Sequence, residues 1–103
     1  MSCYLIVSTH LDAEKDRTHY DEYIRQVRPI VERYGGEYLV RTEQLTALSE
    51  RWKPDRLIII RFPDRTSLDH CFSSPEYLSI LSLRTCCTDS RAVIAEGVSY
   101  EDF

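Results

Sequence analysis

The stretch Arg56-Leu57-Ile58-Ile59-Ile60-Arg61-Phe62 decides the fold of this chain. Its run of branched aliphatic residues, closed by Pro63-Asp64, is typical of a β-strand that is covered on both faces. The segment Cys3–Thr9 has the same character, because residues 4–7 are aliphatic or aromatic at every position. Two such strands predict the centre of a sheet, with an apolar surface on the side that helices leave uncovered.

A long amphipathic helix is predicted between these two strands. Apolar and tyrosine residues recur there every three or four positions, as on the buried face of a helix. They are Tyr20, Tyr23, Ile24, Val27, Ile30, Val31 and Tyr34. We expect the helix to begin at a capping box, Thr18–Asp21, to kink at Pro29 and to end at Gly35-Gly36.

The segment Glu37–Thr42 alternates and predicts another strand, which we expect to continue after a break through 45–49. Tyr38 and Arg41 are three positions apart on this strand, so we expect their side chains on opposite faces. A turn containing Trp52 then leads into the central strand.

Capping residues place the remaining elements. Thr66–Asp69 has the form of a second capping box, and Ser74-Pro75 is typical of the start of a helix that we expect to reach about Thr85. The segment 91–97 predicts the last strand. The order β-α-β followed by β-α-β predicts an α+β, ferredoxin-like fold: a four-stranded antiparallel sheet with the helices on one face, formed by residues 1–103 as a single domain.

The apolar side of this sheet predicts a homodimer. The first and third strands are central in this topology, so their apolar residues form one contiguous patch on the uncovered face. Two copies of the chain that meet sheet to sheet would cover it.

Composition excludes several classes of partner. The net charge of the 103 residues is −4, so the field that attracts nucleic acid is absent. No apolar run reaches the roughly 18–20 residues of a membrane span, and nothing resembles a signal peptide. We therefore expect a soluble cytoplasmic protein with no nucleic-acid or membrane partner.

The four cysteines are Cys3, Cys71, Cys86 and Cys87. They form no C-x-x-C pair, and we expect them to be reduced packing residues. Cys86-Cys87 leaves soft-metal binding or oxidation open as an alternative. Histidines at metal-binding spacing are absent too, and nothing indicates haem or flavin, so we expect no metal and no cofactor.

A few polar and aromatic residues are candidates for a site. Arg41 and Arg61 are placed to grip a carboxylate with a two-pronged hydrogen bond, or else to pair with a nearby glutamate. His10 closes the first strand and is the candidate general base. Tyr38 and Tyr77 are candidates for a cavity wall that orients a substrate by hydrogen bonds, and Trp52 for a residue that caps a pocket or packs on a partner subunit.

The chain also resembles the small bacterial proteins grouped as domain of unknown function 1330. The matching blocks, in the same order and spacing, are Tyr20-Asp-Glu-Tyr23, Pro29, Gly35-Gly-Glu-Tyr-Leu-Val-Arg41, Trp52-Lys-Pro-Asp-Arg56, Phe62-Pro63, Ser74-Pro-Glu-Tyr77, Arg84 and Glu96-Gly97. The resemblance covers about residues 3–98 and implies membership of the dimeric α+β barrel superfamily. It therefore implies a sheet joined to a partner's sheet, with a cavity in or beside each.

Two functions are compatible with these features. The first is a cofactor-independent enzyme, monooxygenase- or isomerase-like, acting on a small organic molecule. The second is a non-catalytic protein that uses the same dimer cavity to bind a small molecule or to form an assembly. The superfamily includes enzymes, haem proteins and ligand-binding regulators, so the resemblance does not choose between them.

Overall fold

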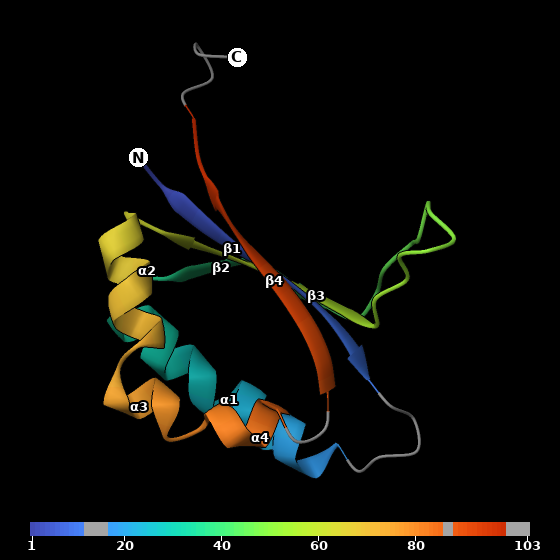
Figure 1. The fold of residues 1–103 in the computed structure, drawn as a ribbon, viewed down its shortest axis with the longest axis horizontal. Helices are drawn as coiled ribbons and strands as arrows, with labels where there is room; N and C mark the ends of the chain where they lie inside the picture. Colours follow the sequence, from blue (N-terminus) through green and yellow to red (C-terminus); the bar gives the residue numbers. More distant parts are fainter. Residues whose placement is uncertain (12–16, 86–87, 99–103) are drawn as a thin grey trace.

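The described part of the chain, residues 1–11, 17–85 and 88–98 of a computed structural model, forms one antiparallel sheet covered on one face by helices (Figure 1). The sheet has the strand order β2-β3-β1-β4. The elements are β1 (Cys3–Leu11), α1 (Thr18–Arg33), β2 (Glu37–Thr42), β3 (Arg56–Phe62), α2 (Arg65–Phe72), α3 (Pro75–Leu78), α4 (Leu81–Thr85) and β4 (Thr88–Glu96). The predicted α+β, ferredoxin-like architecture is confirmed.

Alternation along the central strands gives the sheet two different faces. The even-numbered residues of β3 are buried beneath the helices, whereas the odd-numbered ones are half-buried and face away. We call the side away from the helices the open face. In register across it lie Tyr4, Ile6, Ser8, His10, Glu37, Val40, Thr42, Leu57, Ile59, Arg61, Asp89, Arg91, Val93 and Ala95. Its centre is apolar as predicted, since Ile6 pairs with Ile59 on one side and with Val93 on the other.

Helix α1 buries the face that the spacing predicted. Its buried residues are Tyr20, Tyr23, Ile24, Val27, Ile30 and Val31. The helix begins at Thr18 with Arg17 in the N-cap position, so the predicted capping box is wrong. The Asp21 carboxylate instead forms an ion pair with Arg17, whose Nη2 lies 3.2 Å from its Oδ1. The helix is continuous through Pro29, and Gly35 has the predicted left-handed conformation, with φ +88°.

Strand β2 ends at Thr42, so the predicted continuation through 45–49 is wrong. The backbone N–H of Gln44 donates to Thr42 Oγ1 at 2.9 Å, a local bond that replaces pairing along the sheet. The segment 43–55 then extends away from the body of the molecule before the chain returns as β3 (Figure 1).

Short helices connect β3 to β4. Asp64 caps α2, because its Oδ1 accepts a hydrogen bond from Ser67 N at 2.7 Å; the predicted cap at Thr66 is wrong. Ser74 caps α3 as predicted, and its Oγ accepts from Tyr77 N at 3.2 Å. The single helix expected after it is divided into α3 and α4, and β4 begins earlier than expected.

Two of the cysteines lie in the core. Cys3 and Cys71 are free and buried, and burial raises the pKa of the Cys71 thiol to about 11. The alternatives for Cys86 and Cys87 fall outside the described residues. Among the helices of the described ranges, none is long and apolar enough to cross a membrane.

Candidate functional site

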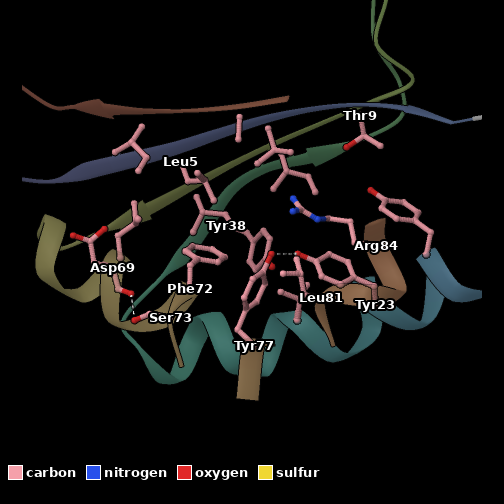
Figure 2. Close-up of a pocket in the computed structure, with 18 residues that line it drawn as sticks. Leu5, Thr9, Tyr23, Tyr38, Asp69, Phe72, Ser73, Tyr77, Leu81 and Arg84 are labelled. Atoms are coloured by element: carbon pink, nitrogen blue, oxygen red, sulfur yellow. Dashed lines mark hydrogen bonds between the residues drawn. The ribbon is translucent and has the colours of Figure 1, made fainter. Parts of the chain in front are cut away.

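A cavity of about 550 Å³ lies between the helices and the face of the sheet that they cover (Figure 2). Odd-numbered residues of β1 and even-numbered residues of β3 and β4 form its roof, and aromatic and aliphatic side chains of the helices form its floor. Most of this lining is apolar, and the few polar groups come from tyrosines, one arginine and the cavity ends. A cavity of this size and character fits a compact organic molecule.

Two tyrosine hydroxyls meet in the cavity floor. Tyr23 of α1 and Tyr77 of α3 are both buried, and their hydroxyl oxygens are 3.1 Å apart. Burial, helped by the neighbouring Tyr77, raises the pKa of Tyr23 well above its ordinary value, so its hydroxyl keeps its proton at neutral pH. The Ser74 cap fixes the turn that carries Tyr77, and Phe72 packs edge-on against its ring with centroids 4.8 Å apart.

Tyr38 enters the cavity from β2, and a β-bulge changes its relation to Arg41. Tyr38 pairs with Ile60 and Arg41 with Ile58, with an extra residue accommodated between Tyr38 and Val40. Both side chains therefore share the helix-covered face, and the prediction of opposite faces is wrong. The Arg41 guanidinium lies 5.6 Å from the centre of the Tyr38 ring but does not line the cavity. Burial raises the pKa of Tyr38 to about 12.

Sequence reasoning missed two polar residues of the cavity, Tyr23 and Arg84. The half-buried side chain of Arg84 reaches into the cavity from α4 (Figure 2). Its Cζ lies 6.0 Å from the centre of the Tyr23 ring. A signal was present, because Tyr77, Leu81 and Arg84 follow the i, i+4, i+7 spacing of one helical face, and all three line the cavity.

The two ends of the cavity are polar but already hydrogen-bonded. At one end Asp69 Oδ1 accepts from Arg65 Nε at 2.9 Å, and Ser73 Oγ donates to the Asp69 carbonyl at 2.6 Å. At the other end Thr9 Oγ1 lies 3.0 Å from Ser90 Oγ.

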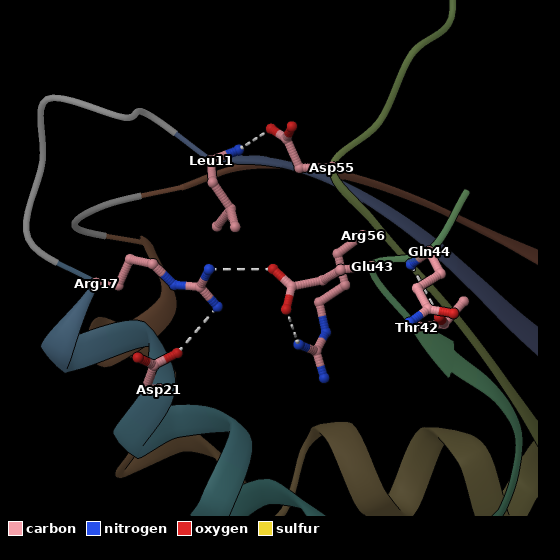
Figure 3. Close-up of polar contacts among 8 residues, drawn as sticks. All are labelled: Leu11, Arg17, Asp21, Thr42, Glu43, Gln44, Asp55 and Arg56. Carbon is pink, nitrogen blue, oxygen red and sulfur yellow. Dashed lines mark hydrogen bonds and ion pairs between the residues drawn. The ribbon is translucent and has the colours of Figure 1, made fainter. Parts of the chain in front are cut away.

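Ion pairs fasten the segment after β2 near the Thr9 end. The Glu43 carboxylate forms two ion pairs, with Arg17 Nη1 at 3.1 Å and with Nη1 of the buried Arg56 at 3.8 Å (Figure 3). It therefore connects the start of α1 with β3. Asp55 Oδ2 accepts from Leu11 N at 2.7 Å and holds the end of β1 to the same segment. These contacts fix the segment in place, and none of their charged side chains is among the described residues that line the cavity.

His10 and Arg61 lie on the open face, so the structure does not bring these predicted site residues to the cavity. His10 stands opposite Asp89 on the edge strand β4. Arg61 pairs with Glu37, which is the ion-pair alternative that the sequence left open.

Trp52 also lies apart from the cavity. It is 54% exposed and belongs to segment 43–55, where it forms an isolated bridge with Ser49. It lines a second hollow of about 630 Å³ beside this segment. Of the predicted site residues, the cavity thus gathers Tyr38 and Tyr77. In the described ranges, no cluster of three or more His, Cys, Asp or Glu side chains is arranged to hold a metal ion.

Comparison with known proteins identifies the family and the fold. Residues 2–98 match the family described as Domain of unknown function (DUF1330). A protein of unknown function from Rhodopseudomonas palustris, RPA0582, has a similar structure, with a TM-score of 0.79 and 18% identity over 95% of this chain and 83% of that chain. SnoaB, a cofactor-independent oxygenase from Streptomyces nogalater, has a TM-score of 0.65 and 12% identity over 95% and 94% of the two chains.

A dimeric ferredoxin-like protein of unknown function from Jannaschia sp. CCS1 is also similar, with a TM-score of 0.71 and 14% identity over 94% of this chain and 100% of that chain. A search of curated proteins finds no match. At these identities the structural similarities show the fold alone.

Proposed function

The chain belongs to the family described as Domain of unknown function (DUF1330), and we propose that it binds a compact organic molecule between its sheet and helices and transforms it without a cofactor. The observation that carries this proposal is the cavity of about 550 Å³, apolar in its walls, into which the hydroxyls of Tyr23, Tyr38 and Tyr77 converge. Protonated phenols can donate hydrogen bonds to a carbonyl or phenol oxygen and so orient it. The oxygenase SnoaB, which shares the fold, supports cofactor-independent chemistry.

A second function, binding without catalysis, is favoured by a different observation. In the described part of the chain the cavity holds no unpaired carboxylate or histidine, since Asp69 is bonded to Arg65 and His10 lies on the open face. A general base positioned beside the ligand is therefore missing from the groups the cavity presents. Measured turnover separates the two functions.

The working unit in this proposal is a homodimer that is closed through the open face. Val93 of the edge strand β4 is 61% exposed on that face, and Ile6, Ile59 and Leu57 extend the apolar area across the central strands. An apolar surface of this kind marks an interface in soluble proteins. The Jannaschia protein, which has the same fold, is described as dimeric.

The test is a ligand screen with a blocked cavity as the reference. Ala92 lines the cavity from the edge strand β4, so Ala92→Trp fills it, while Leu78→Trp adds the same ring at a site that is 55% exposed on α3 and outside the cavity. The screen contains phenols, carbonyl compounds and aromatic acids. We expect its hits to raise the thermal midpoint of the wild type and of Leu78→Trp, and to leave the thermal midpoint of Ala92→Trp unchanged. Hits that stabilise all three proteins equally contradict the site.

Catalysis is then tested on the hits. Oxygen consumption together with mass spectrometry of the product distinguishes an oxygenase, which adds oxygen, from an isomerase, which leaves the mass unchanged. Binding that depends on the cavity, with no product from any hit, supports the non-catalytic function instead.

A further inference from the structure

Arg84 places a positive charge in the cavity without a counter-charge. Its Nε is buried and has no hydrogen-bond partner among the described residues. Across the described ranges no carboxylate lies within ion-pairing distance of its guanidinium. The guanidinium instead lies over the aromatic ring of Tyr23. A guanidinium cannot release its proton in a protein, so it cannot relieve burial by becoming neutral. Arg84 is half-buried, and a cation that is partly withdrawn from water without a partner is costly, a cost that an anion entering the cavity would remove.

The Tyr23–Tyr77 pair adds a hydrogen-bond donor beside this cation. The two hydroxyls hold two protons, and the bond between them uses one, so the other can be donated to a ligand. Figure 2 shows Arg84 reaching into the space between the sheet and this pair. A guanidinium with a phenol donor nearby is a combination suited to a carboxylate, whose two oxygens accept several hydrogen bonds.

The rest of the cavity fits an apolar body. Tyr38, Phe72 and Leu5 line the space beyond Arg84, and the carboxylate of Asp69 at the far end is bonded to Arg65. A ligand with one charged end and a hydrocarbon or aromatic body therefore meets a suitable surface along its whole length.

We propose that the cavity selects small monocarboxylates with an apolar body, and that Arg84, assisted by the Tyr23–Tyr77 pair, binds the carboxylate. This inference rests on the proposed function, since it names the ligand class of the same cavity. It gives Arg84 a specificity-determining role, in place of a purely structural contact with the Tyr23 ring.

The experiment compares acids with amides of the same shape. Phenylacetate and 3-phenylpropionate, with phenylacetamide and 3-phenylpropionamide as neutral counterparts, are titrated by calorimetry and followed by ligand-observed NMR. We expect the wild type to bind each acid at least about tenfold more tightly than its amide, as charged hydrogen bonds in a partly buried site provide.

Variants then locate the effect. Arg84→Met keeps the length and apolar surface of the side chain and removes its charge, so we expect acid binding to fall to the level of the amide while amide binding is unchanged. Arg28→Met is the matched control, because that side chain is 63% exposed on α1 and lies outside the cavity. We expect it to bind both series like the wild type.

The outcomes separate this inference from the proposed function. Equal binding of acids and amides by the wild type, abolished by Ala92→Trp, overturns the monocarboxylate inference and keeps the cavity as a ligand site. Full acid affinity in Arg84→Met, or a preference for acids that survives Ala92→Trp, also overturns it. Binding of neither series at millimolar concentration contradicts both proposals for these probes. If Arg84→Met does not fold, the acid-to-amide ratio of the wild type and its loss in Ala92→Trp decide.

Discussion

At the scale of single residues, the contact between the Tyr23 and Tyr77 hydroxyls couples the cavity to the stability of the fold. The two groups are buried on different helices, and each is the hydrogen-bond partner of the other at 3.1 Å. Removing either one leaves the other buried without its partner, which costs more than the bond itself contributes. The same pair that we propose for ligand binding therefore also holds α3 to α1.

A double-mutant cycle tests this coupling. We expect Tyr23→Phe and Tyr77→Phe each to lower the free energy of unfolding by about 1–2 kcal/mol. The double variant should lose less than the sum by about 0.5–1 kcal/mol, because the second substitution removes a group that was already unpaired. Urea unfolding followed by circular dichroism measures all four proteins.

Tyr34→Phe is the control for the cycle. The hydroxyl of Tyr34 donates to Glu76 Oε2 at 2.9 Å and does not contact Tyr23. Combined with Tyr23→Phe, its effect should be additive. Additive losses for the Tyr23 and Tyr77 substitutions would show instead that their hydroxyls are not coupled.

Gly36 gives a second prediction at this scale, based on space rather than on hydrogen bonds. A Cβ at this position would overlap with Val31 Cγ1 and lie 3.0 Å from ring atoms of Phe62, both of which are fully buried. We expect Gly36→Ala to lower the free energy of unfolding by about 1–3 kcal/mol, as overpacking of a core does.

Gly35→Asn provides the comparison for Gly36→Ala. Gly35 needs a left-handed backbone, which Asn adopts readily, and a Cβ there meets only Pro63 at an ordinary distance of 3.4 Å. We expect a loss below that of Gly36→Ala in the same urea experiment. The reverse order would mean that conformation, and not space, limits this turn.

At the scale of elements, the periodic segments were predictable and the local irregularities were not. The runs of β3 and the stripe of α1 repeat a period several times, so they indicate both the element and its buried face. The bulge in β2 adds one residue to an otherwise alternating strand and has no sequence signature of its own. Strict alternation therefore predicts Arg41 on the face opposite Tyr38, whereas the bulge brings both side chains to the same face. Arg84 was missed for a different reason, since arginine side chains are rarely buried without a partner, and its helical spacing from Tyr77 does not by itself indicate a place in a cavity.

The cap of α2 shows how one side chain makes an element sensitive to pH. Asp64 accepts a hydrogen bond from the backbone N–H of Ser67, and this bond lowers the pKa of its carboxyl below the ordinary value. A carboxyl with a lower pKa in the folded state stabilises the protein above its unfolded-state pKa. That contribution is lost as the pH falls through the folded-state pKa.

We therefore expect the advantage of the wild type over Asp64→Asn to shrink on acidification. Asn is also a good N-cap but carries no charge to titrate, whereas Asp64→Ala should have the lowest thermal midpoint near neutrality. Thermal unfolding at about pH 7 and about pH 3 measures the three proteins. Parallel pH dependence for the wild type and Asp64→Asn would contradict the capping role of the ionised carboxylate.

At the scale of the whole molecule, the sheet separates two apolar surfaces for which we propose different uses. The helix-covered side encloses the cavity, whose lining among the described residues comes from one chain. The open side carries apolar side chains at its centre. Ligand binding and dimerisation should therefore be separable, although both depend on the same four strands.

Val93→Glu tests that separation. Val93 is 61% exposed in the single chain, so a glutamate there leaves the protomer core intact. If two copies meet through the open face, however, they bury this carboxylate against an apolar surface, which is costly. By size-exclusion chromatography with light scattering at micromolar concentration, we expect the wild type to be a dimer and Val93→Glu a monomer. Leu78→Glu, 55% exposed on the helix side, should remain a dimer. The thermal midpoint should rise with protein concentration for the dimeric proteins only.

Because the cavity lies on the other side of the sheet, the monomeric variant should keep the wild-type preference for acids over amides. A monomeric wild type would remove the dimer from the proposal, and a monomeric variant that had lost the preference would show that the partner helps to complete the site.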